Sequence, residues 1–136
     1  NDRFFNYENR IYRPFMTDQL LLKQLMTILF DNAIKYTEED GKIEFVVYAT
    51  DRHLYLTVTD NGIGISAADK KKIFDRFYRV DKARTRQKGG FGLGLSLAKQ
   101  IVDALRGTIT VKDNKPRGTI FEVKIAIQSP PKRKNK

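Results

Sequence analysis

The sequence of 136 residues contains no cysteine, so it can form neither a disulfide nor a thiolate metal site. This absence is compatible with a reducing compartment. Its longest apolar runs are a few residues, far short of a membrane span, and no secretory signal opens the chain. A hydrophobic content of 40% excludes an intrinsically disordered chain. Because the sequence starts at Asn1 rather than Met, we expect a piece of a longer protein.

The excess of positive charge is confined to two segments. The formal net charge is +10, of which residues 70–88 carry +7 and residues 130–136 carry +4, leaving −1 for the rest. Proteins that bind nucleic acid present a broad basic face, so we expect no nucleic-acid partner. We interpret residues 1–129 as one domain and residues 130–136 as a basic disordered tail.

The hydrophobic periodicity predicts an α+β fold. Strands are predicted at residues 10–16, 42–49, 54–59, 108–112 and 119–127. Helices are predicted from a cap at Thr17 or Asp18 to Tyr36, over 68–74, and from the glycine run at 89–94 to Gly107. The predicted buried stripes of the two long helices are Leu21, Leu25, Ile28 and Leu29, and Leu93, Leu97, Ile101 and Leu105. We expect a two-layer sandwich, with about three helices over a mixed, mostly antiparallel sheet.

An amide side chain falls on the predicted buried stripe of the first helix. Asn32 lies one turn after Ile28, and Lys35 and Tyr36 follow on the same side of the helix. A buried amide without partners costs a few kcal/mol. On helix statistics alone, a hydrogen-bonded core amide beside a solvated lysine is the simpler interpretation.

A carboxylate falls on a predicted core-facing row. Asp60 shares the strand parity of Leu56 and Val58, and such a group is rare in a core unless it accepts hydrogen bonds. Gly62 and Gly64 follow, where a ligand can approach the backbone. An aspartate that closes a turn is the simpler alternative.

The glycine run at residues 89–94 precedes a helix, whose free N–H groups suit phosphate. The run lacks the last glycine of a dinucleotide fingerprint and the lysine of a P-loop. Together with the net charge of +7 at residues 70–88, it makes a polyphosphate a natural partner.

Five segments in order resemble the motifs of sensor histidine kinase catalytic domains. The segments at residues 29–37, 60–65, 73–79, 90–95 and 118–119 resemble the N, G1, F and G2 boxes and a Gly-Thr element. The resemblance implies the Bergerat ATP-binding fold, the substrate ATP and the cofactor Mg²⁺. The residues it implies for ATP binding are Asn32, Lys35, Tyr36, Asp60, Gly62, Gly64, Ile65, Phe77, Gly90, Gly92, Leu93, Gly94, Leu95 and Thr119.

Within that set, the resemblance implies particular roles. Asn32 would hold Mg²⁺, and Asp60 would accept a hydrogen bond from the adenine amino group. Lys35 would approach phosphate, and Tyr36 would pack beside the adenine ring. Residues 79–91 would form a mobile lid, from which Arg79 and Arg84 are our choices for catalytic phosphate contacts.

The resemblance also implies transfer of the γ-phosphoryl group to a histidine on a separate dimerisation domain. The only histidine, His53, falls in a predicted turn, so we expect the acceptor to lie elsewhere. The resemblance further implies a response regulator as a downstream partner. It also implies a homodimeric full-length protein that is anchored in a membrane, with this domain in the cytoplasm. Ile28 replaces the general base of related hydrolases, which disfavours ATP hydrolysis. A related ATPase, a serine kinase or a nucleotide-binding pseudokinase are the alternatives.

Overall fold

Five strands form one mixed sheet in a computed structural model that describes residues 4–11, 15–76 and 93–128. The strands are β1 (Phe4–Arg10), β2 (Lys42–Ala49), β3 (His53–Asp60), β4 (Thr108–Asp113) and β5 (Thr119–Ala126). Their order is β1-β2-β3-β5-β4. β1 pairs in parallel with β2, and the other three pairings are antiparallel. The predicted mixed, mostly antiparallel sheet is confirmed.

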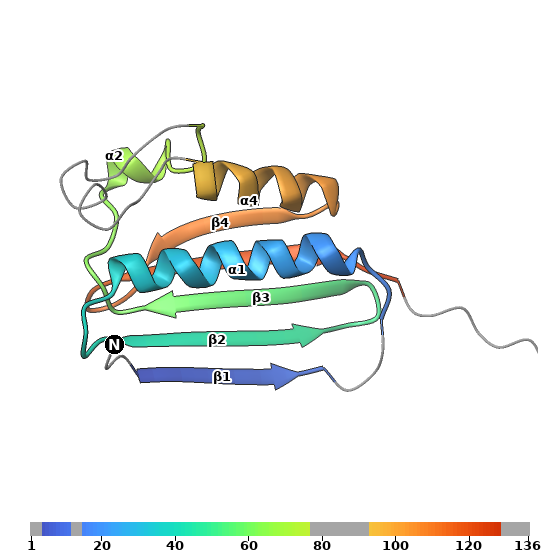
Figure 1. Cartoon of the computed structure of the whole chain (residues 1–136), viewed down its shortest axis with the longest axis horizontal. Coiled ribbons are helices and arrows are strands. Elements are labelled where there is room, and N and C mark those ends of the chain that lie inside the picture. The colour runs from blue at the N-terminus through green and yellow to red at the C-terminus, as the bar shows by residue number, and fades with distance from the viewer. Residues whose placement is uncertain (1–3, 12–14, 77–92, 129–136) are drawn as a thin grey trace, which may run out of the picture.

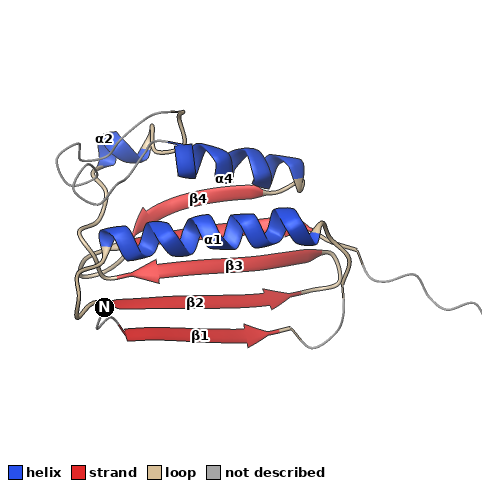
Figure 2. Cartoon of the chain, in the orientation of Figure 1, coloured by secondary structure: helices blue, strands red, loops and turns tan. Residues whose placement is uncertain are grey.

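Helices lie on one side of this sheet, so the fold has two layers (Figures 1 and 2). Within the described ranges they are α1 (Gln19–Tyr36), α2 (Ala67–Lys70) and α4 (Leu93–Ala104). α1 and α4 lie side by side over the sheet, whereas α2 lies near the start of α4 (Figure 1). The α+β prediction is confirmed. No helix among the described residues is long and apolar enough to cross a membrane.

A side-chain cap and a narrow apolar stripe define α1. The Asp18 carboxylate accepts a hydrogen bond from the N–H of Leu21 at 3.0 Å and so satisfies a free donor of the first turn. The fully buried residues of the helix are Leu25, Leu29 and Ala33. Ile28 and Asn32 are half-buried, so Asn32 lies at the edge of the buried stripe on which it was predicted.

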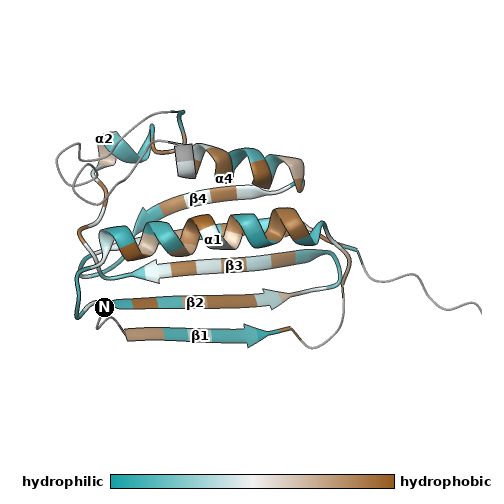
Figure 3. Ribbon diagram, in the orientation of Figure 1, coloured by the Kyte–Doolittle hydropathy of each residue, from teal (hydrophilic) through white to brown (hydrophobic). Residues whose placement is uncertain are grey.

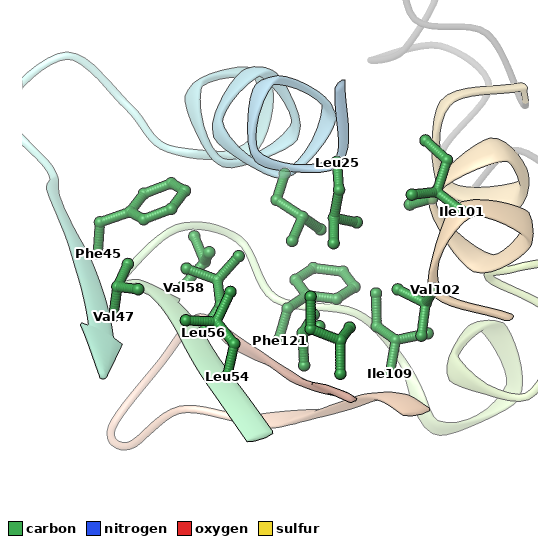
Figure 4. Close-up of a cluster of buried hydrophobic side chains, with 14 of the residues drawn as sticks. Leu25, Phe45, Val47, Leu54, Leu56, Val58, Ile101, Val102, Ile109 and Phe121 are labelled. Atoms are coloured by element: carbon green, nitrogen blue, oxygen red, sulfur yellow. The ribbon is translucent and has the colours of Figure 1, made fainter. Parts of the chain in front are cut away.

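The core lies between the two layers. Alternate residues of β2, β3 and β5 point towards the helices because a strand has a period of two. Figure 4 shows Val58, Leu56 and Phe121 of the sheet beneath Leu25 of α1, with Ile101 and Val102 of α4 to one side. In Figure 3 the apolar segments follow α1, α4 and the central strands, whereas most of β1 is hydrophilic.

The first strand was predicted in the wrong place. It was expected at residues 10–16, but β1 ends at Arg10, residues 12–14 lie outside the described part, and Met16 makes only an isolated bridge with Gln128. Phe5 and Tyr7 of β1 stay 53% and 58% exposed while contacting Phe30 and Phe45. Parallel pairing with β2, rather than burial, fixes this strand, and pairing leaves little trace in the sequence.

Two helical predictions also need correction. The helix expected over 68–74 is helical only over Ala67–Lys70, and turns follow to residue 76. In α4 the predicted Leu97 is 44% exposed, whereas Ala98 and Val102 are fully buried. Ile101 and Leu105 of the predicted stripe are buried as expected, so among its described side chains only Leu97 was wrongly assigned to the buried side of α4. The proposed tail at 130–136 lies outside the described residues.

Arg106 holds the left-handed position that ends α4, where Gly107 was predicted to end it. Its φ is 59°, and the N–H groups of Arg106 and Gly107 donate to the carbonyls of Asp103 and Val102. This is the usual helix-ending pattern, in which glycine normally takes the left-handed residue. A side chain at Gly107 would begin 2.1 Å from the carbonyl oxygen of Lys124, so both consecutive positions favour glycine.

We predict that Arg106→Gly raises the free energy of unfolding by about 1 kcal/mol, because glycine adopts this φ without steric cost. Urea denaturation followed by circular dichroism measures the change. Arg106→Ala is the matched control, since it removes the same guanidinium but keeps a Cβ at a positive φ. Equal stabilisation by both variants would attribute the effect to charge and contradict the backbone explanation.

Candidate functional site

Three elements from distant parts of the sequence end or begin at the same end of the molecule. The C-terminus of α1, the end of β3 and the start of α4 meet there (Figure 1). The N–H of Ile63, after β3, donates to the carbonyl of Tyr36 at 3.1 Å. A side chain at Gly94, in the first turn of α4, would begin 3.8 Å from the Ile28 side chain of α1. The segments that carry the predicted site are therefore neighbours.

Asp60 is a buried carboxylate at this junction, with only 3% of its surface exposed. Its Oδ1 accepts a hydrogen bond from the N–H of Gly62 at 2.8 Å, and the backbone N–H of Thr119 also donates to the carboxylate. Burial raises its pKa from 3.8 to about 6, because desolvation of the charge outweighs the two backbone hydrogen bonds. The sequence prediction that Asp60 faces inward is confirmed.

The loop that follows Asp60 packs tightly against the end of α1. A side chain at Gly62 would begin 1.8 Å from the carbonyl oxygen of Tyr36, so only glycine fits there. Gly64 has a φ of 78°, a conformation that L-residues with side chains rarely adopt. Asn61 exchanges hydrogen bonds with the backbone of Lys42, its Oδ1 accepting at 2.8 Å. Close packing therefore requires glycine at position 62, and the backbone conformation favours it at position 64.

The last two turns of α1 contribute an amide, a cation and an aromatic ring. Asn32, Lys35 and Tyr36 are each half-buried. Within the part of the chain that is described, the Lys35 ammonium has neither an ion pair nor a hydrogen bond, which leaves it available to an anion. The arrangement predicted for these residues, on one side of the helix end, agrees with the helical geometry.

The start of α4 and the neighbouring strand supply the remaining described residues of the predicted site. α4 begins at Leu93, and Gly94 and Leu95 are half-buried in its first turn. Thr119 pairs with Asp60 in the β3–β5 ladder, and Ile65 is buried in the core. A twelve-residue helix directs the N–H groups of its first turn towards this end of the molecule.

Several predicted residues cannot be located in this geometry. Phe77, Gly90 and Gly92, the catalytic choices Arg79 and Arg84, and the expected lid at 79–91 lie outside the described residues. Of the predicted motif at residues 73–79, Ile73 is buried and Phe74 packs edge-on against Phe121 at 6.2 Å between ring centroids.

Sequence reasoning missed two residues of the turn between β4 and β5. Asn114 Nδ2 donates to the carbonyl of Asp60 at 2.8 Å, and Arg117 Nε donates to the carbonyl of Gly62 at 2.7 Å. A connection at residues 113–118 follows from the strands predicted at 108–112 and 119–127, but nothing in its sequence indicated which backbone it would contact. That contact follows from the β3–β5 pairing, which joins positions about sixty residues apart.

The comparisons with known proteins agree with the geometry. A sequence model of the family described as histidine kinase-, DNA gyrase B- and HSP90-like ATPases matches residues 17–129. The chain is 81% identical over 134 residues to sensor protein CiaH of Streptococcus pneumoniae, covering 98% of this chain and 30% of CiaH. It is 45% identical over 101 residues to the signal transduction histidine-protein kinase ArlS of Staphylococcus aureus, covering 74% of this chain and 22% of ArlS.

A solved structure has the same fold. The mycobacterial sensor histidine kinase MprB matches with a TM-score of 0.76 at 28% identity, over 93% of this chain and 86% of that one. The two curated relatives are far longer, and the chain spans less than a third of either.

We predict that Asp60 makes the folded domain less stable as the pH rises. Its folded pKa of about 6 exceeds its ordinary value of 3.8, so its contribution to stability is complete below pH 3.8 and is lost as the pH rises through 6. The loss is at most about 3 kcal/mol. Urea denaturation of the wild type and of Asp60→Asn from pH 4 to pH 7.5 isolates the contribution of Asp60 to the free energy of unfolding. The other carboxylates titrate in both proteins, so their contributions cancel in the difference. Parallel stability curves would contradict the raised pKa.

Proposed function

The chain belongs to the family of histidine kinase-, DNA gyrase B- and HSP90-like ATPases, as the ATP-binding catalytic domain of a sensor histidine kinase, and we propose that it transfers the γ-phosphoryl group of ATP to a histidine on a separate dimerisation domain. The observation that carries the proposal is Asp60. It is a buried carboxylate on a family motif, at the same end of the molecule as the N-terminus of α4, which suits a polyphosphate.

The proposed role of Asp60 is to recognise adenine. An ionised carboxylate accepts hydrogen bonds and donates none, and the exocyclic amino group of adenine is a donor. Two backbone N–H groups already fix the carboxylate, which leaves further lone pairs for a base. Guanine has a carbonyl where adenine has this amino group, so the same site would disfavour it. Tyr36, half-buried at the end of α1, would pack beside the ring.

The proposed phosphate contacts come from α1 and α4. Lys35 offers an ammonium without an ion pair in the described ranges, and Gly94 stands in a helix turn with free N–H groups. Gly90, Gly92, Arg79 and Arg84 would add contacts from the neighbouring segment. Phosphoryl transfer depends mainly on positioning and on stabilising charge, and these groups supply both.

Magnesium is proposed as the metal that accompanies ATP. The described residues contain no group of three or more histidine or acidic side chains that could hold a metal by themselves. Mg²⁺ typically takes only one or two protein ligands, together with phosphate oxygens and water. The half-buried amide of Asn32 fits that need for a single oxygen ligand, and the ion would neutralise charge on the phosphates.

The phosphoryl acceptor is proposed to lie on another domain. His53 begins β3 and Asp60 ends it, so seven strand steps separate them by roughly 23 Å. Ile28 faces the first turn of α4 with a methyl group, in the position where related hydrolases activate water. A response regulator downstream, and a homodimeric, membrane-anchored full-length protein with this domain in the cytoplasm, belong to the same proposal.

We predict that Asn32→Ala weakens ATP binding roughly tenfold in the presence of Mg²⁺ and has little effect in EDTA, because the lost amide acts through the metal. Calorimetric titration with and without Mg²⁺ measures both affinities. Gln24→Ala is the matched control, since it removes an exposed amide from the same helix. An equal loss with and without the metal would assign Asn32 to packing or to direct contact with the nucleotide.

We predict that the chain mixed with ATP labelled at the γ-phosphate labels a separate two-helix dimerisation domain of its own kinase. The adduct should be labile in acid and stable in base, as expected for phosphohistidine. Without that domain, neither the chain nor water should receive the label quickly. Label on this chain, or fast phosphate release without the partner, would refute the proposal. A fused version of the two domains distinguishes failed chemistry from a weak interface.

A further inference from the structure

The backbone at the end of β3 and in the loop that follows it, residues 60–66, is held by the turn between β4 and β5. Two side chains of this turn donate to its backbone carbonyls. Asn114 Nδ2 lies 2.8 Å from the oxygen of Asp60, and Arg117 Nε lies 2.7 Å from the oxygen of Gly62. Both hydrogen bonds are partly buried, where losing one leaves a carbonyl shielded from water.

The amide of Asn114 is oriented for this purpose. Its Oδ1 accepts a hydrogen bond from the N–H of Lys115 at 2.9 Å, so its Nδ2 is the group that faces the carbonyl of Asp60. The turn itself closes without the side chain, because the backbone N–H of Asn114 donates to the carbonyl of Gly118 at 3.0 Å. Removing the amide would therefore take away its hydrogen bond to the Asp60 carbonyl without opening the turn.

Arg117 is anchored at both ends of its guanidinium. Nε donates to Gly62, and Nη2 lies 3.8 Å from a carboxylate oxygen of Glu38, just after α1. Both side chains of this ion pair are more than half exposed, so the pair adds little stability by itself. It does hold Arg117 across the loop, which connects the end of α1 to the turn.

Backbone contact makes this arrangement stiff. A side chain at Gly118 would begin 2.0 Å from the carbonyl oxygen of Asp60, and its φ is 112°. A side chain at Gly62 would begin 1.8 Å from the carbonyl oxygen of Tyr36, at the end of α1. The backbone that carries the Asp60 carboxylate is therefore held between α1 and the turn, with little room to shift.

We propose that Asn114 and Arg117 are positioning residues that set the selectivity of this site for adenine. The inference rests on the proposed role of Asp60 as the residue that recognises the base. A single carboxylate discriminates between bases only when it is held to within a fraction of an ångström. Asn114 and Arg117 hold the carbonyl groups of Asp60 and Gly62. Through this backbone they position the Asp60 carboxylate and the Gly62 N–H that donates a hydrogen bond to it.

The test measures the dissociation constants of ATP and GTP for Asn114→Ala, Arg117→Met and the double variant. Each single change should weaken ATP about five- to tenfold and leave GTP nearly unchanged, so the ATP preference falls. At saturating ATP, phosphorylation of the separate partner domain should keep its kcat within about twofold while KM rises. Hydrogen exchange at the backbone amide of Gly62 should become faster in the same variants.

Lys115→Met is the matched control. It removes the same charge as Arg117→Met from the same turn, and its side chain makes no hydrogen bond or ion pair with the described residues. Its ATP and GTP affinities should match the wild type. An equal fall in Lys115→Met and Arg117→Met would assign the effect to long-range charge and overturn the positioning role.

The outcomes separate this inference from the proposed function. If the wild type prefers ATP but the double variant keeps the same preference, the positioning role is wrong and the function stands. If the wild type binds ATP and GTP equally, the role of Asp60 fails first. Equal losses for both nucleotides would indicate a structural role only. The preference is a ratio measured on folded protein, so it stays decisive for the single variants if the double variant fails to fold.

Discussion

The cost of burying the Asp60 carboxylate governs the structure at this end of the domain. Burial raises its pKa to about 6, so near neutral pH the ionised form is held against its own preference for water. Two backbone N–H groups, from Gly62 and Thr119, recover part of that cost. The Gly62 donor is local, two residues along the loop, whereas the Thr119 donor is brought to Asp60 by the β3–β5 pairing. The sheet order is thus a condition for the site.

Close contacts between backbone segments are the second constraint on the structure around Asp60. A Cβ placed on Gly62 would lie 1.8 Å from the carbonyl oxygen of Tyr36, and one placed on Gly118 would lie 2.0 Å from that of Asp60. At the far end of α4, Arg106 occupies a left-handed position without a glycine. The contrast is physical, since the end of α4 can tolerate about 1 kcal/mol of strain whereas a backbone clash beside Asp60 would displace the carboxylate.

Local patterns predicted what depends on local physics. The Asp18 cap, the bounds of β2 and the inward parity of Asp60 follow from side-chain chemistry and from the period of the elements. Tertiary packing decided the rest. α4 is apolar on more than one side, and Ala98 is fully buried whereas Leu97 is 44% exposed. β1 is fixed by pairing alone.

The same contrast between local patterns and tertiary packing explains which parts of the candidate site could be predicted. Asn32, Lys35 and Asp60 are anomalies on otherwise regular elements, so a pattern exposes them. Asn114 and Arg117 act only through carbonyls of a strand end about fifty-five residues away, which no spacing reveals. A domain built in this way holds the Asp60 carboxylate in close backbone contacts, whereas its one histidine, His53, lies at the other end of β3. The proposed recognition of the base by Asp60 and the proposed external acceptor are compatible, because an in-line transfer requires the nucleotide to be fixed and the second reactant to arrive.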